Sequence, residues 1–171
     1  MRQSVESDAS GLKDPRWVAL VHAEREVTKR RAELYELGPE VSGVVAAALR
    51  AGGSWDKRTA LDFLRSFPKY VPLMLDAVMG QAISHGWARE AQEVIAAADR
   101  ESVLAGLRSL VPVYLEARDA EMYRSIAGVL VRVEAWEMLS ALVSEALESA
   151  DLDTVEAGED FRSRYGAMFG G

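Results

Sequence analysis

The chain of 171 residues contains no cysteine. Disulfides, thiolate nucleophiles and thiolate metal sites are therefore excluded, and the composition is compatible with a reducing compartment. Histidine is nearly as scarce, since the sequence holds only His22 and His85. His22 lies one helical turn before Glu26, but a closed metal site needs three or four ligands and nothing near this pair supplies the others. We therefore expect no metal and no cofactor.

Long apolar runs are also missing. No stretch approaches the roughly 18 uninterrupted apolar residues of a membrane span. The opening MRQSVESDASG carries charge and serine where a signal peptide needs an apolar run. The sequence therefore predicts a soluble protein of the cytoplasm with no membrane partner.

Motifs for phosphate binding and nucleophilic catalysis do not occur. The patterns G-x-x-x-x-G-K-[ST] and G-x-G-x-x-G are absent, and no serine stands in a G-x-S-x-G context. The sequence displays no cluster of polar side chains of the kind that an active site needs. We therefore expect that the protein is not an enzyme.

Positive charge is missing from residues 133–161, which hold nine of the 27 acidic residues and no lysine or arginine. The net charge of −7 comes from this end of the chain, because residues 1–132 are neutral overall. An acidic end repels phosphate, so we expect no nucleic-acid partner. The nine acids are Glu134, Glu137, Glu145, Glu148, Asp151, Asp153, Glu156, Glu159 and Asp160.

An apolar pattern is present three times at one fixed spacing along the chain. Its positions follow the series i, i+3, i+4, i+7, i+8 and i+11, which places them on one face of an α-helix. The fixed period, about 32 residues, is typical of stacked helical hairpins. The equivalent sets are Val71, Met74, Leu75, Val78, Met79 and Ala82; Val103, Gly106, Leu107, Leu110, Val111 and Tyr114; and Ala135, Met138, Leu139, Leu142, Val143 and Ala146.

Caps and helix breakers place the helices. Asp14 before Pro15 predicts the start of a long N-terminal helix that ends near residue 37, and a second helix follows at 40–51. Three hairpins are then predicted at 55–67 with 69–84, 87–98 with 100–117, and 120–132 with 134–149. Asp99 and Asp119 are candidate N-caps, and Pro112 predicts a kink or an early helix end. Residues 150–160 predict only a turn or two of helix.

The predicted fold is all-α: tandem antiparallel hairpins with a repeat of about 32 residues form a short right-handed α-solenoid, preceded by a longer N-terminal helix. We expect a disordered N-terminus at residues 1–13, a single helical-repeat domain at 14–150, and an acidic segment with a flexible tail at 151–171.

Helix pairs at this period resemble the α-solenoid repeat class of tetratricopeptide and HEAT proteins. The resemblance covers residues 54–149, and 15–51 loosely, and it is one of period. Trp55 and Trp87 lack the other residues of the tetratricopeptide consensus, and Pro72 and Pro112 lie in second helices rather than the first helix of a HEAT unit. Such families bind peptides or proteins, so the resemblance implies a non-enzymatic protein–protein interaction module, a scaffold or adaptor.

Two other functions remain open. An acidic inhibitor or immunity-type protein would cover a basic site on a partner, and a small-molecule-binding helical domain would use a pocket between hairpins. The oligomeric state is also open. Trp and Tyr are enriched at interface hot spots, and the acids suit a basic partner. The candidate partner-binding residues are therefore Trp55, Trp87, Tyr114, Glu134, Glu137, Glu145 and Glu148.

Overall fold

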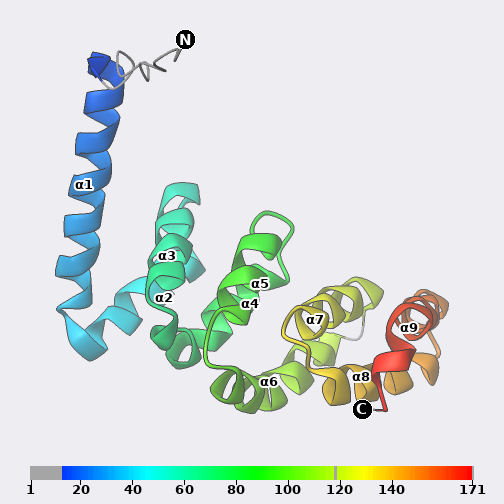
Figure 1. Cartoon of the computed structure of the whole chain (residues 1–171). Coiled ribbons are helices and arrows are strands. Elements are labelled where there is room, and N and C mark those ends of the chain that lie inside the picture. The colour runs from blue at the N-terminus through cyan, green and yellow to red at the C-terminus, as the bar shows by residue number, and fades with distance from the viewer. Residues whose placement is uncertain (1–12, 118, 171) are drawn as a thin grey trace, which may run out of the picture. The chain divides into compact units, whose positions relative to one another are not determined.

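The computed structural model describes residues 13–117 and 119–170. Within these residues the chain forms nine α-helices joined by turns and short 3-10 helices, and it forms no strand (Figure 1). The prediction of an all-α protein is confirmed. The chain divides into two compact units, Met1–Val41 and Ser42–Gly171, and each is described by itself.

The first unit is dominated by α1 (Pro15–Tyr35), the longest of the described helices. The Asp14 carboxylate caps it by accepting a hydrogen bond from the Arg16 backbone N–H at 2.8 Å, as predicted. The 3-10 helix η2 (Gly38–Glu40) follows, and Gly38 takes a positive φ of 62° that glycine adopts without strain. Apart from Lys13, the predicted disordered N-terminus lies outside the described residues.

The second unit holds the remaining helices. Each of them packs against helices close to it in the chain: α3 contacts α5, α5 contacts α7, α4 contacts α5 and α6, and α9 contacts α7 and α8. The α-helices are α2 (Val41–Ala51), α3 (Ser54–Ser66), α4 (Leu75–Ala82), α5 (Ala88–Ala96), α6 (Arg100–Tyr114), α7 (Ala120–Arg132), α8 (Trp136–Leu147) and α9 (Leu152–Tyr165). The 3-10 helices are η3 (Pro68–Tyr70), η4 (Pro72–Met74), η5 (Leu115–Ala117) and η6 (Gly166–Met168).

The predicted N-caps are confirmed. The Asp99 carboxylate accepts a hydrogen bond from the Ser102 N–H at 2.9 Å, and that of Asp119 accepts one from the Met122 N–H at 2.7 Å. Both bonds satisfy donors that the first turn of a helix leaves free. Hydrogen bonding from Ser102 also holds the pKa of the Asp99 carboxyl below its usual range. Helices α6 and α7 therefore begin where the sequence indicates.

Many of the repeating apolar positions lie in the core, together with apolar residues of α2, α3, α5 and α7. Leu75, Leu107 and Leu139, which are equivalent in the pattern, are all buried, on α4, α6 and α8 respectively. Close approach explains the glycine inside α6: a Cβ on Gly106 would lie 2.5 Å from Cδ2 of Leu75. Gly106 therefore allows α4 and α6 to pack closely at this point.

One predicted helix is wrong at its start. Residues 69–84 do not form one continuous helix, because residues 68–74 form the 3-10 helices η3 and η4, and α4 begins at Leu75. Pro68 and Pro72 each open one of these short helices. Proline has no backbone N–H to donate, so an α-helix cannot pass through both positions without losing hydrogen bonds.

The prediction of a turn or two of helix after Ser149 is also wrong. Helix α9 runs for 14 residues, capped by the Asp151 carboxylate, which accepts hydrogen bonds from the backbone N–H and the hydroxyl of Thr154. A Cβ on Gly158 would lie 3.0 Å from Cβ of Ala146, so α9 packs closely on α8. Part of the predicted flexible tail, residues 161–165, therefore belongs to a packed helix.

We predict that Leu107→Asp unfolds the protein, because Leu107 has no exposed surface and a buried unpaired carboxylate costs several kcal/mol. That cost is comparable with the whole stability of a domain, about 5–15 kcal/mol. Val113→Asp is the matched control, since Val113 lies on the same helix and is 60% exposed. Thermal melting followed by circular dichroism compares the two variants. Wild-type melting of Leu107→Asp would refute the assignment of α6 to the core.

Candidate binding groove between α6 and α8

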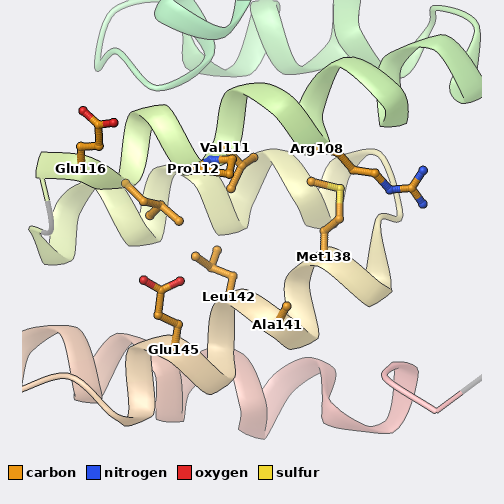
Figure 2. A pocket seen from close by; sticks show the side chains of 9 residues that line it. Arg108, Val111, Pro112, Glu116, Met138, Ala141, Leu142 and Glu145 are labelled. Atoms are coloured by element: carbon orange, nitrogen blue, oxygen red, sulfur yellow. The ribbon is translucent and has the colours of Figure 1, made fainter.

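An open groove with a volume of about 560 Å³ lies between α6 and α8 (Figure 2). Its residues come from α6, from the 3-10 helix η5 that follows α6, and from α8; α6 and α8 carry equivalent sets of the repeating pattern. They are Arg108, Val111, Pro112, Leu115, Glu116, Met138, Ala141, Leu142 and Glu145. We call this set the α6–α8 groove.

The floor of the α6–α8 groove is apolar. Val111, Leu115 and Leu142 are buried there, while Pro112 and Ala141 are exposed along its walls. Pro112 and Ala141 supply the accessible apolar surface of the groove, and the polar side chains of Arg108, Glu116 and Glu145 border it. The groove therefore offers a place where apolar side chains of a ligand can be removed from water.

Met138 lines the α6–α8 groove at a position of the repeating pattern. It stands at the position equivalent to Gly106 in the next unit of the repeating pattern. Gly106 allows Leu75 of α4 to come close to the α6 backbone, whereas Met138 places a long side chain beside the α6–α8 groove (Figure 2). Equivalent positions thus hold glycine where α4 and α6 approach closely and methionine beside the groove.

Pro112 sets the geometry of the α6 wall. It has no N–H to donate to the Arg108 carbonyl, and α6 ends two residues later, at Tyr114. The chain continues as the 3-10 helix η5, which carries the groove residues Leu115 and Glu116. The irregular helix end predicted from Pro112 therefore forms one end of the groove.

The two ends of the α6–α8 groove differ in charge. Arg108 and Met138 lie at one end, and Glu116 and Glu145 lie at the other (Figure 2). A guanidinium nitrogen of Arg108 pairs with the Glu137 carboxylate at 3.6 Å. Within the part of the chain that the structure describes, Glu116 and Glu145 form no ion pair. The second end therefore carries negative charge that these residues do not neutralise.

Helix direction adds to this charge. Both α6 and α8 run from the Arg108 end toward the Glu116 end, so their C-terminal turns lie beside the two glutamates (Figure 2). The C-terminus of an α-helix carries a partial negative charge of roughly half an elementary unit. Two glutamates and two helix ends together make this end attractive to a cation.

A second depression, of about 290 Å³, adjoins the groove at Arg108 and Met138. Two of the predicted partner-binding residues, Glu134 and Glu137, line it together with Arg100. Arg100 donates a hydrogen bond to the Glu134 carbonyl at 3.2 Å, and Arg108 pairs with the Glu137 carboxylate. The Glu137 carboxylate therefore has a cation partner, unlike those of Glu116 and Glu145, whereas Arg100 contacts only the backbone of Glu134.

The structure separates the other predicted residues. Glu145 lines the α6–α8 groove and Glu148 is exposed at the C-cap of α8. Trp55 is 79% exposed on α3, where the Arg58 guanidinium lies 6.0 Å from its ring centre, and Trp87 is half-buried before α5.

Sequence reasoning missed most of the groove. Arg108, Glu116, Met138 and Ala141 were not among the predicted partner-binding residues, although they line it. Two signals could have indicated the site: proline inside the second helix of a hairpin, and methionine at a repeat position that holds glycine one unit earlier. Neither signal predicts how far apart α6 and α8 lie, and the groove depends on that distance.

The described residues offer no comparable metal or membrane feature. No group of three or more His, Asp or Glu side chains among them could hold a metal ion. None of the helices they form is both long enough and apolar enough to cross a bilayer. A small apolar space between α7, α8 and α9 has a volume of only about 10 Å³, enough for about one water molecule.

The chain was compared with protein-family models, curated proteins and solved structures, and none of them matches it.

Tyr114 lies outside the α6–α8 groove and joins three helices. Its hydroxyl donates to the Asp76 carboxylate at 3.0 Å or to the Asp76 carbonyl at 3.1 Å. A guanidinium nitrogen of Arg50 pairs with the same carboxylate at 3.0 Å. Residues of α2, α4 and α6 therefore share one polar network. Burial, followed by the bond to Asp76, raises the pKa of Tyr114 to about 12.

We predict that Tyr114→Phe removes a tyrosine that ionises near pH 12, whereas an ordinary tyrosine ionises near pH 10. The folded state holds this proton more tightly than the unfolded chain, so the free energy of unfolding falls as pH rises from about 10 to about 12. In the Tyr114→Phe variant the free energy of unfolding should therefore fall less over this pH range. Spectrophotometric titration and urea unfolding at both pH values measure the two effects. If the substitution instead removes an absorbance change that titrates near pH 10, the prediction is contradicted.

Proposed function

We propose that the chain is a non-enzymatic protein–protein interaction module, a scaffold or adaptor, that binds a partner in the α6–α8 groove. The observation that carries this proposal is the groove itself, an apolar floor open to solvent between two helices. Apolar surface bounded by polar side chains is a feature of ligand-binding grooves and of protein–protein interfaces.

We further propose that the hairpins of the second unit stack as a short right-handed α-solenoid. Two sets of contacts support it: the first helices of successive hairpins touch, α3 with α5 and α5 with α7, and the second helices α4 and α6 touch. The parallel course of α6 and α8 is also what equivalent helices of a stack would have (Figure 2).

A protein partner suits the groove better than a small molecule does. A small-molecule site is a concavity with a volume of about 300–1,000 Å³, and it buries roughly 70–90% or more of the surface of its ligand. The α6–α8 groove has a volume in this range, but it is an open channel between two helices rather than an enclosed pocket. A helical segment of a partner fills such a channel along its length.

The acidic inhibitor or immunity-type function is the second candidate. The charge of Glu116 and Glu145 favours it, because a basic partner would supply the missing cations. The acidic stretch is less concentrated than its sequence indicates, since Glu137 pairs with Arg108 and lies eight residues, about 12 Å, before Glu145 on α8. A partner would therefore meet a short acidic end rather than a continuous acidic face.

We predict that Ala141→Arg removes partner binding without unfolding the protein. Ala141 is exposed and lines the groove, so a long charged side chain there obstructs the apolar floor. Ala47→Arg on α2 is the matched control, because Ala47 is an exposed helical alanine outside the groove. Affinity capture from a lysate of the source organism, with quantitative mass spectrometry, should show proteins that wild type and Ala47→Arg retain and that Ala141→Arg loses about tenfold, or about 1.4 kcal/mol. Identical capture by all three folded proteins would refute the groove as the binding site.

A further inference from the structure

We propose that the α6–α8 groove binds two turns of an amphipathic α-helix of the partner, with a lysine or arginine of that helix placed against Glu116 and Glu145. This inference rests on the proposed function and adds the chemistry of the partner. Three features of the groove carry it: its length, the structure of its walls and its charge.

The length of the groove matches two helical turns. Arg108 and Glu116 are eight residues apart on one wall, and Met138 and Glu145 are seven residues apart on the other. At roughly 1.5 Å per residue these separations correspond to about 12 Å and about 10.5 Å. Apolar residues at positions i, i+4 and i+7 of a docked helix span the same length, so three anchors can reach the floor.

The walls favour a helix over an extended strand. An extended segment needs partners for its backbone N–H and C=O groups, and it finds them at the edge of a sheet. Both walls here are helices, whose backbone groups are largely bonded within α6 and α8. A helical ligand satisfies its own backbone and has to offer only side chains to Val111, Leu115 and Leu142.

The charges of the groove select the sign of the ligand. Glu116 and Glu145 converge from two different helices, and no described cation pairs with either of them. The nearby C-terminal turns of α6 and α8 add further negative potential. At the opposite end Arg108 forms an exposed ion pair with Glu137 at 3.6 Å, so this pair carries no net charge. A basic residue beside the apolar anchors therefore fits the groove better than an acidic one.

Two fluorescein-labelled peptides test the inference. Each has about 15 residues, the length at which alanine-rich helices become marginally stable in water. Both carry leucine at i, i+4 and i+7, and one has lysine at each end of the leucine stripe where the other has glutamate. Because both ends carry the same charge, the test does not depend on the direction of docking. Fluorescence anisotropy should show that the lysine peptide binds the full chain at least about tenfold more tightly than the glutamate peptide.

A charge exchange provides the decisive comparison. In the double variant Glu116→Lys/Glu145→Lys the preference should reverse, so that the glutamate peptide binds more tightly. The matched control is Glu156→Lys/Glu159→Lys, which changes two exposed acids of α9 by the same net charge and should keep the preference for lysine. A lysine peptide with leucine at every second residue, which suits a strand, should bind at least about tenfold more weakly than the helical one.

The outcomes separate this inference from the proposed function. Equal binding of the lysine and glutamate peptides to wild type, or reversal by the α9 control, would overturn the basic partner. Binding of the strand-patterned peptide as tight as that of the helical one, or no binding of any peptide, would overturn the amphipathic helix. In each case a loss of captured proteins with Ala141→Arg would leave the groove as the interaction site, whereas unchanged capture would refute the proposed function itself.

Discussion

The second unit depends on the burial of an apolar stripe that each short helix cannot cover alone. Leu75, Leu107 and Leu139 repeat at one fixed interval, and each is buried among neighbouring helices. Helical hairpins of this size become stable when neighbours share such surfaces. The fit between neighbours is decided by small differences: Gly106 allows close packing of α4 and α6, whereas its counterpart Met138 lies beside a groove. The α6–α8 groove thus lies where the burial shared by neighbouring helices is incomplete.

Under the proposed function, this incomplete burial also bears on which partners the groove can select. The floor of the α6–α8 groove offers the apolar area that supplies affinity, and the two glutamates at one end offer charge, which mainly governs association rate and discrimination between partners. Glu116 lies on η5 and Glu145 on α8, far apart in the sequence, so the negative end exists only in the folded chain. The acidic stretch at residues 133–161 looks uniform in sequence, yet in the structure Arg108 neutralises Glu137 and leaves Glu145 unpaired among the described residues.

Much of the secondary structure could be predicted, because helix periodicity and capping are local. The α7 helix has its predicted bounds, and the caps at Asp99 and Asp119 start their helices as expected. Helix α9 was missed because its buried positions are Thr154, Ala157 and Gly158, which give no apolar period. The start of α4 was missed because the proline pattern over residues 68–74 outweighs the apolar pattern there.

The groove could not be predicted because its residues are distant in sequence and its openness depends on how far two helices stand apart. Pro112 marked an irregular helix end, but nothing local indicated that Leu115 and Glu116 would face Leu142 and Glu145. The predicted anchor Trp55 lies on α3, and Tyr114 joins a network with Asp76, so neither lines the groove. The residue types Trp, Tyr and Glu suggested which residues could bind a partner, but residue type does not predict which of them lie together in the folded chain.

The measurement that tests the central claim most directly is a ¹³C-methyl NMR spectrum of the methionines during titration with the lysine peptide. Met138 lines the groove, Met79 is fully buried on α4, and Met168 is exposed after α9. The account predicts that the Met138 methyl signal shifts with saturation while those of Met79 and Met168 stay in place. A saturable shift at Met168 or Met79 with Met138 unchanged would contradict it.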